Sequence, residues 1–275
     1  MYLKKFIAPF LILVLLSIGK TTQASDSITC KIWVDSVFAT MTPDQRIGQL
    51  FIYNSPAQND TQTLNSLNRT NNEQQIGGIL FWDGTIKDQA ELTNAAQTTA
   101  KIPLMICMDG EWGLSMRLKD GLRYPKKTTL AALTDEQLIY ELGVEIGRQC
   151  NEMGIHVNFD PVVDVNLNLE NPVINSRSFG DNPTDIARKA SLYYEGMRSK
   201  NILAVAKHFP GHGDTFQDSH NELAIVSHNT KELNEIDLYP FKKLIEKNHP
   251  DNQKQYCNNH QIANVCWRNT EKISD

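Results

Sequence analysis

The sequence predicts an α/β protein of the (β/α)8 TIM-barrel type with about five β/α units, on three observations. Short apolar runs alternate with stretches of helical spacing along the chain. These runs are nearly continuous, which is typical of parallel strands buried on both faces. Polar residues such as Asp109 and Lys207 directly follow the runs, and TIM-barrel sites lie at the carboxyl ends of the strands.

A doubly wound open sheet is the alternative for the same alternation of strands and helices. Sheets of that type that bind dinucleotides carry a glycine-rich phosphate loop after the first strand. No such loop follows the first apolar run here. The barrel is therefore the preferred prediction.

The N-terminus, residues 1–24, has the layout of a secretory signal peptide. Lys4 and Lys5 precede an apolar run over residues 6–18, and the small residue Ala24 closes the segment. The apolar run is too short to favour a membrane span, although a transmembrane anchor is the alternative. We therefore expect an exported protein, periplasmic or extracellular, with no stable membrane span after signal removal.

The composition bounds the function class. With 40% apolar and 21% charged residues, the chain of 275 residues is typical of a globular protein, as one large domain or two small ones. The net charge of −5 and the lack of a basic stripe give no reason to expect nucleic acid. The five cysteines show neither a CxxC pair nor metal-ligand spacing, and Cys107 and Cys150 are expected in the core. An odd cysteine count in an exported protein leaves at least one thiol unpaired.

The first elements after the signal are predicted from turn and cap residues. Residues 25–41 form a polar lead into a short helix with Thr42 as the N-cap and Pro43 at the first helical position. A first strand is predicted over residues 48–53. The polar, Asn-rich stretch 55–72 is expected to be a long loop.

The rest of the chain continues the alternation. Further strands are predicted over residues 76–82, 103–108, 156–161 and 202–209. Helices are predicted over residues 88–99, from Thr134 as a cap to about Glu152, over 183–200 and over 231–247. In the second of these helices, Leu138, Leu142 and Ile146 are expected on one buried face.

The densest group of titratable residues lies in residues 207–220, with the sequence K-H-F-P-G-H-G-D-T-F-Q-D-S-H. The segment begins at the end of a buried strand and breaks into a loop at Pro210-Gly211. Its titratable side chains are Lys207, His208, His212, Asp214, Asp218 and His220. Such a group past the carboxyl end of a strand indicates an active site.

This segment resembles the signature of glycoside hydrolase family 3, in its β-N-acetylhexosaminidase branch. Supporting matches lie at residues 108–111, 159–164, 171–174 and 177–180. The resemblance covers roughly residues 40–248. The Asp-x-His ending of the 207–220 segment distinguishes this branch from the glucosidase branch.

The resemblance implies a glycoside hydrolase that cleaves terminal N-acetyl-β-D-hexosaminides with retention, through a glycosyl-enzyme intermediate and without cofactor or metal. It implies a carbohydrate substrate, such as cell-wall or chitin-derived fragments. On the family pattern, His220 is the acid/base and Asp218 its orienting partner. The sugar-binding roles fall on Asp109, Arg177, Lys207 and His208.

The residue chemistry agrees with these roles. In an extended segment, residues two apart project to one side, so Asp218 can bond to His220. An imidazole with an ordinary pKa of about 6.5 exchanges protons near neutral pH once a carboxylate fixes its tautomer. Strand alternation sends Lys207 and His208 to opposite sides, so both reach a sugar only where the strand ends.

Other polar residues near the motifs are given different roles. Arg117 is placed equally between sugar binding and the surface. His212 and Asp214 are expected to be loop scaffold. Asp160 and Asp164 are interpreted as caps that end the fourth strand.

The sequence departs from the family at its C-terminal end. The family nucleophile is an aspartate after the seventh strand, but the barrel pattern stops near residue 248. The tail, residues 249–275, is polar without apolar periodicity, and neither Asp251 nor Asp275 in it follows a strand. We therefore assign no nucleophile. The expected domains are the signal, a partial barrel over 25–248 and this tail, as in a truncated member of the family.

Two further hypotheses come from other classes. A catalytically inactive carbohydrate-binding remnant would keep the sugar-binding residues and lack turnover. A metal hydrolase would use His208, His212, Asp214 and His220 as ligands, although their spacing matches no familiar metal motif.

Overall fold

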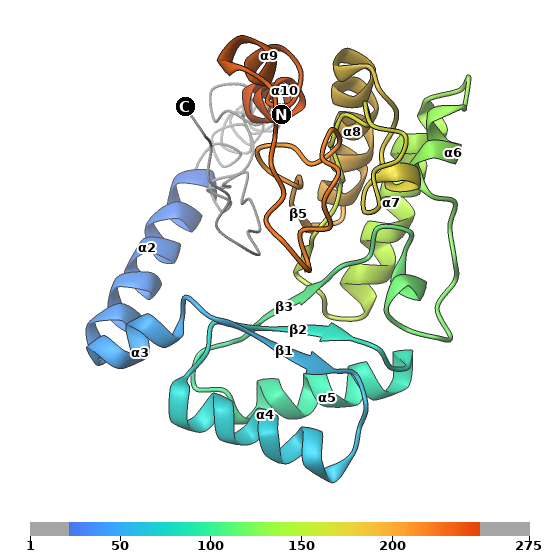
Figure 1. The fold of residues 1–275 in the computed structure, drawn as a ribbon. Coiled ribbons are helices and arrows are strands. Elements are labelled where there is room, and N and C mark those ends of the chain that lie inside the picture. The colour runs from blue at the N-terminus through green and yellow to red at the C-terminus, as the bar shows by residue number, and fades with distance from the viewer. Residues whose placement is uncertain (1–21, 248–275) are drawn as a thin grey trace, which may run out of the picture.

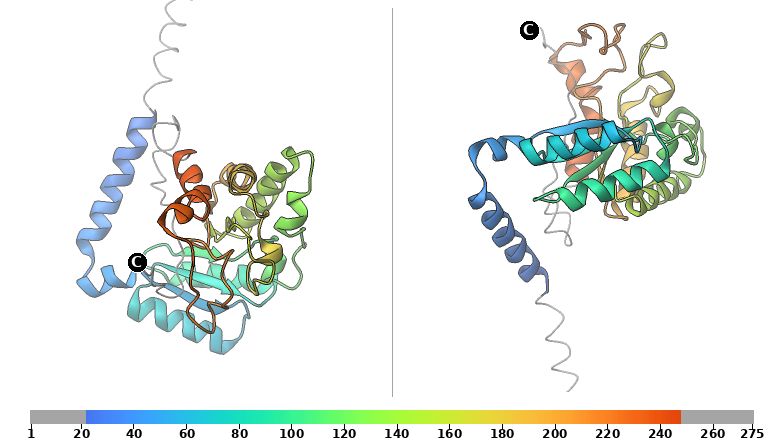
Figure 2. Two further views of the ribbon diagram at one scale, coloured as in Figure 1. Left: turned by 45° about the horizontal axis from the view of Figure 1, so that its top comes forward. Right: turned by 90° about the horizontal axis from the view of Figure 1, so that it is seen from below.

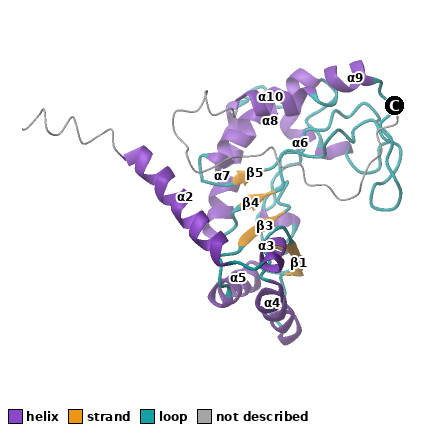
Figure 3. Cartoon of the chain, turned by 90° about the vertical axis from the view of Figure 1, so that its left-hand side faces the viewer, coloured by secondary structure: helices purple, strands orange, loops and turns teal. Residues whose placement is uncertain are grey.

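The computed structural model describes residues 22–247, with side chains from residue 31 onward, and forms one parallel sheet. The strands follow chain order: β1 (Ile52–Pro56), β2 (Gly78–Trp82), β3 (Met105–Met108), β4 (Val157–Asn158) and β5 (Leu203–Ala204). Every neighbouring pair is parallel (Figure 1, Figure 3). A parallel sheet in chain order with helical crossovers is the wall of a TIM-type barrel, and the described residues form part of one.

Helices fill the connections between strands. They are α2 (Thr22–Thr40), α3 (Pro43–Gly48), α4 (Thr61–Gln74), α5 (Ile86–Thr99), α6 (Lys127–Ala131), α7 (Gln137–Glu152), α8 (Pro183–Arg198), α9 (Thr230–Glu235) and α10 (Tyr239–Lys247), with short 3-10 turns η2 (Leu114–Met116) and η3 (Asn175–Arg177). Helices α4 and α5 lie against one face of β1–β3 (Figure 1). Both views of Figure 2 show α2 extending away from the sheet.

The two faces of the sheet have separate apolar clusters. Ile106 belongs to the large cluster between sheet and helices, while its neighbour Cys107 belongs to a small cluster on the opposite face with Val157, Phe159 and Val205. Successive strand residues point to opposite faces, which explains this division. The small cluster occupies the side that forms the interior of a barrel.

Several predicted elements are confirmed with shifted ends. Thr42 caps α3 in a capping box with Gln45, as the Thr-Pro pair predicted. The first strand was placed too early, because Gly48 still belongs to α3 and the strand begins at Ile52. The fourth and fifth strands keep only two paired residues each before the chain turns into the site.

The prediction of a loop over residues 55–72 was wrong. Helix α4 occupies most of it and begins after Asp60, whose carboxylate accepts from the Thr63 N–H at 2.7 Å. The helix is strongly polar, and its main buried apolar contact is Leu67, supported by Leu64. A narrow apolar stripe gives a weak helical pattern, so the cap was the clearer signal.

Helix α7 is rotated from the predicted orientation: Ile146 is buried and Leu142 packs against the core as predicted, but Leu138 does not. Leu138 is 46% exposed, whereas Ile139 and Ile146 are buried. The rotation follows from close contact with α8, where a Cβ at Gly196 would lie 2.3 Å from the Tyr140 carbonyl oxygen.

Two other predictions about helix boundaries were also wrong. Glu136, not Thr134, precedes the helix, and residues 231–247 form two helices because the chain turns between α9 and α10.

Several sequence predictions lie outside the described residues. These are most of the signal segment 1–24, the tail 249–275 with Asp251 and Asp275, and Cys257 and Cys266. Residues 25–41, predicted as a polar lead, instead belong largely to α2. Across residues 22–247, no helix combines the length and apolarity needed to cross a membrane.

Candidate functional site

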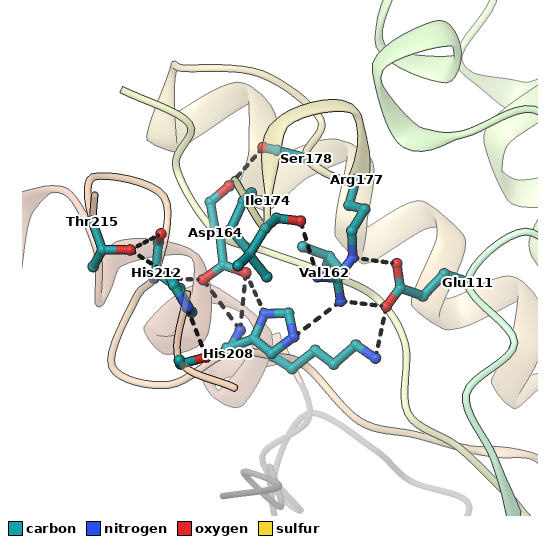
Figure 4. Close-up of polar contacts among 12 residues, drawn as sticks. Glu111, Val162, Asp164, Ile174, Arg177, Ser178, His208, His212 and Thr215 are labelled. Carbon is teal, nitrogen blue, oxygen red and sulfur yellow. Dashed lines mark hydrogen bonds and ion pairs between the residues drawn. The ribbon is translucent and has the colours of Figure 1, made fainter. Parts of the chain in front are cut away.

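The carboxyl ends of β3, β4 and β5 bring their polar residues together at one end of the sheet. Asp109 directly follows β3, Asp164 lies in the loop after β4, and Lys207 and His208 follow β5. Arg177 enters from η3, which lies between β4 and α8. Figure 4 shows the resulting network of polar side chains.

Glu111 is the centre of this network. Its carboxylate accepts two bonds from Arg177, at 2.7 and 2.9 Å, and lies 2.8 Å from Lys207 Nζ (Figure 4). Burial opposes ionisation of Glu111, but the charges and hydrogen bonds of Lys207 and Arg177 outweigh it and hold its pKa well below the usual range. Glu111 therefore stays anionic and fixes both cations.

Asp109 is the more accessible carboxylate. Lys207 Nζ donates to it at 2.9 Å and Arg117 at 2.8 Å, and its side chain is 23% exposed. Burial opposes its charge, yet Lys207 and Arg117 lower its pKa. The sequence left open whether Arg117 binds sugar or lies on the surface. Its contact with Asp109 places it in the network. A partly exposed carboxylate held by two cations is suited to accept hydrogen bonds from sugar hydroxyls.

The contacts of His208 define its tautomer. Arg177 Nη2 lies 3.1 Å from Nε2 and, because a guanidinium only donates, Nε2 must accept. Nδ1 therefore carries the proton and donates to Asp164 Oδ2 at 2.6 Å. Burial, aided by the charges of Lys207 and Arg177, lowers the pKa of His208 despite Asp164. His208 is a neutral imidazole that orients Arg177.

Asp164 has a larger role than the strand cap that was predicted. Its buried carboxylate also accepts the backbone N–H groups of His208, at 3.1 Å, and His212, at 2.8 Å. Burial raises the pKa of such a carboxyl, but the electrostatic attraction of the His208 ring N–H and the hydrogen bonds from His208, together with His212, leave the pKa lowered. Asp164 thus fixes the strand end and the start of the following loop together.

Asp160 combines the predicted cap with a buried ion pair. Its Oδ1 accepts from the Val162 N–H at 3.0 Å, as a strand-ending cap would. Its Oδ2 lies 2.7 Å from Lys127 Nζ, which also donates to the Glu111 carbonyl oxygen at 2.6 Å. The Lys127 ammonium lies 4.0 Å from the centre of the Tyr193 ring. This fully enclosed pair holds the backbone of Glu111 in place.

The predicted dyad forms within the loop after β5. His220 Nδ1 lies 2.7 Å from Asp218 Oδ1, and the His220 backbone N–H donates to the same oxygen at 2.9 Å. The contact arises in a tight turn, so the expected extended conformation was wrong. The backbone and ring hydrogen bonds of His220 lower the pKa of Asp218. With Asp218 accepting at Nδ1, the other ring nitrogen of His220 is left for proton exchange.

A chain of contacts links the dyad loop to the network. Ser219 Oγ lies 2.9 Å from His212 Nε2, and the backbone of His212 is bonded to Asp164. The other ring nitrogen of His212 contacts Thr215 Oγ1 (Figure 4). These contacts agree with the scaffold role that the sequence suggested for His212.

The network is electrically balanced. Three carboxylates, Asp109, Glu111 and Asp164, face three cations, Arg117, Arg177 and Lys207, around a neutral imidazole. A balanced, hydrogen-bonding surface is suited to a neutral polyhydroxylated ligand. The ring nitrogens of His208, His212 and His220 are directed to separate partners, and within residues 22–247 no group of three or more His, Cys, Asp or Glu side chains is arranged to hold a metal ion.

Comparison with known proteins places this network in a family. The profile described as the glycosyl hydrolase family 3 N terminal domain matches residues 42–251. The chain belongs to glycoside hydrolase family 3. This family domain thus includes every element from α3 to α10.

Three similar proteins carry the names of hexosaminidases or N-acetylglucosaminidases. The chain is 36% identical over 195 residues to beta-hexosaminidase A of Pseudoalteromonas piscicida, covering 64% of this chain and 31% of that protein. It is 33% identical over 208 residues to a beta-N-acetylglucosaminidase/beta-glucosidase of Cellulomonas fimi, covering 74% and 35%. The solved family 3 beta-N-acetylglucosaminidase of Paenibacillus sp. str. FPU-7 has a TM-score of 0.68 at 32% identity, covering 76% and 40%. The chain spans about a third of the two curated relatives.

The structure thus joins Asp109, Arg177, Lys207 and His208, while their roles in sugar binding stay predictions. Sequence reasoning missed the roles of Glu111 and Asp164, although both lie in the motifs that carry the resemblance. The sequence does contain a reason to expect such carboxylates in the site. Several cations expected at one buried strand end require carboxylate partners from the neighbouring loops.

Proposed function

We propose that this chain supplies the sugar-binding network and the acid/base dyad of an enzyme that cleaves terminal N-acetyl-β-D-hexosaminides with retention. The observation that carries the proposal is the balanced network at the strand ends, with a His–Asp pair on the loop linked to it. The names of the relatives supply the substrate class.

Sugar binding would use the polar groups that the network gathers at the strand ends. The Asp109 carboxylate accepts hydrogen bonds from ring hydroxyls, while Arg177 and Lys207 donate to hydroxyl or acetamide oxygens. Glu111 and His208 position these donors through their contacts to Arg177 and Lys207. A pre-formed site binds sugar at a smaller entropic cost.

His220 would act as the general acid and then as the general base. Its nitrogen opposite Asp218 protonates the departing glycosidic oxygen, and later takes a proton from the water that releases the sugar. Asp218 fixes the tautomer that this exchange needs. A retaining mechanism also requires a carboxylate nucleophile. Asp109 is unsuited to that role because its charge is paired with Lys207 and Arg117.

The alternative is carbohydrate binding without turnover, through the same network of Asp109, Arg177 and Lys207. Release of nitrophenol from a nitrophenyl N-acetyl-β-glucosaminide tests the enzyme proposal. Turnover should fall by about 10²–10⁴ in His220→Ala. The control Glu222→Gln changes an exposed carboxylate of the same loop and should retain activity. Saturable binding of N-acetylglucosamine with no nitrophenol release would support the alternative.

Export to the periplasm or the cell exterior is proposed from residues 1–24 alone. Their charged start and short apolar run support a cleaved secretory signal. N-terminal sequencing of the protein from its source tests this. A mature N-terminus close to residue 25 is expected, whereas an intact Met1 would contradict it.

A further inference from the structure

A second histidine–carboxylate group lies beside the dyad loop, outside the network described above. His228 Nδ1 is 2.6 Å from Asp237 Oδ2, and its Nε2 is 3.3 Å from Asp214 Oδ2. The side chain of His228 is 13% exposed and that of Asp237 1%. One imidazole thus bridges a buried carboxylate and a more accessible one.

Asp237 is a fixed anchor. It lies in the turn between α9 and α10 and is buried there. Its other oxygen, Oδ1, has no hydrogen-bond partner among residues 22–247. Gly211, which precedes the dyad in the chain, packs closely against Asp237, because a Cβ at Gly211 would lie 2.7 Å from the Asp237 side chain. The φ of Gly211 is +144°, a conformation that favours glycine.

The bridge closes the neck of the loop that carries the dyad. Asp214 and His228 are the two ends, and Asp218 and His220 lie between them, as in a compact Ω-type loop. The outgoing branch has further anchors, because the Asn171 side-chain amide donates to the carbonyl oxygens of His212 and Thr215. The loop returns to the fold at His228. There the His228 ring makes a hydrogen bond to the buried side chain of Asp237.

We infer that His228 is a positioning residue that, as a cation bridging Asp214 and Asp237, holds closed the neck of the loop bearing Asp218 and His220. Its catalytic meaning rests on the function proposed above, whereas its effect on the loop does not. A neutral imidazole has one N–H and can donate to only one carboxylate. Closure at both contacts therefore requires the protonated ring.

The charges around His228 favour that form. Asp237 at the α9–α10 turn, Asp214 on the loop and Glu232 on α9 all face it. Partial burial opposes the charge, but the hydrogen bond and charge of Asp237, with Asp214 and Glu232, raise the pKa of His228. Because the folded-state pKa is raised, the bridge contributes fully below the unfolded value of about 6.5 and is lost as pH rises through the folded value.

Amide hydrogen exchange of the whole chain, without substrate, tests the inference. Peptides covering residues 215–227 are followed from pH 5 to pH 9, and their rates are normalised to those of helix α8 to remove the intrinsic pH dependence. We expect the normalised rate to rise about tenfold as His228 loses its proton. Asp214→Asn should show the fast rate at every pH, while Glu222→Gln, a matched loss of charge on the same loop, should behave as the parent chain.

Two results would overturn the inference. One is protection of residues 215–227 in Asp214→Asn equal to that in the parent chain. The other is an unchanged pH dependence in His228→Gln, which would place the titrating group elsewhere. Since exchange is measured without substrate, a failure here is distinct from a failure of nitrophenol release, which bears on the glycosidase proposal alone.

Discussion

Asp164 accepts the ring N–H of His208 across 2.6 Å, although the two residues are 44 positions apart in the chain. The bond sets the tautomer of His208, which in turn presents an acceptor to Arg177. The orientation of Arg177 therefore depends on a carboxylate that is itself fully buried. Several predictions about single side chains can be drawn from this arrangement.

Replacing Asp164 by Asn should change the position of Arg177 indirectly, through His208, which contacts both residues. An amide group facing Nδ1 favours the opposite tautomer of His208, which then directs an N–H at the guanidinium. Loss of charge-assisted bonds to a buried group should lower the free energy of unfolding by about 2 kcal/mol. Thermal unfolding measures this, with the exposed Asp181→Asn as control. Equal melting temperatures for the two variants would contradict the role of Asp164.

His208 should remain neutral at the pH where an ordinary histidine becomes protonated. Nitrogen NMR of the ring should report a neutral ring with its proton on Nδ1 at the ordinary histidine pKa of about 6.5, because burial lowers the pKa of His208. Detection of the Nε2–H tautomer in His208 at neutral pH would show that Arg177 is held in another way.

The free energy of unfolding should fall in acid, because three carboxylates of the site have lowered pKa values in the folded chain. Asp109, Glu111 and Asp164 all have lowered folded-state pKa values, in spite of burial, because cations and N–H donors surround them. A lowered pKa contributes stability above the unfolded value of about 4, which is lost as pH falls through the folded value. Urea unfolding from pH 7 to pH 3 should show this decline. A flat profile below pH 4 would mean that these carboxylates are not ionised in the folded chain.

Arg177→Lys should weaken sugar binding although the charge is kept. Lysine cannot make the paired bonds to Glu111 and the bond to His208 at once. The Kd for N-acetylglucosamine, measured by calorimetry, should rise about tenfold. Arg188→Lys, on the outer helix α8, is the matched control and should bind as the parent chain does.

Lys127→Met should destabilise the chain strongly. Removing one partner of an enclosed ion pair leaves the charge of Asp160 buried alone, at a cost of about 3–5 kcal/mol. The neighbouring Lys126, which donates to Ser176 at 3.1 Å in a partly buried position, provides a control in Lys126→Met. The latter should cost less than about 1 kcal/mol in urea unfolding. Similar losses in both variants would argue against the buried pair.

The strands and the 207–220 motif could be predicted from the sequence more accurately than the side chains that pair with the site residues. Buried strands such as Met105–Met108 have continuous apolar runs, so their order and parallel pairing could be predicted. Helix α4 was missed because its surface is mainly polar, and Leu138 was wrongly placed on the inward face of α7 because glycines make the close contact of α7 with α8. An apolar pattern does not register glycine as a packing residue.

The missed site partners have a different cause. Glu111 and Arg177 are 66 positions apart, and no local pattern indicates that a loop after β3 meets a 3-10 turn before α8. Tertiary folding decides which carboxylate pairs with which cation. The resemblance identified the cations and the dyad, and the structure showed what holds them.

The most direct test of the account is calorimetric titration of N-acetylglucosamine into the chain and into Asp109→Asn. Asp109 is the accessible acceptor of the network, so we expect saturable binding that weakens about tenfold or more in the variant and is unchanged in Glu222→Gln. Absence of saturable binding by the parent chain, or equal affinity in Asp109→Asn, would contradict the claim that these strand ends bind the sugar.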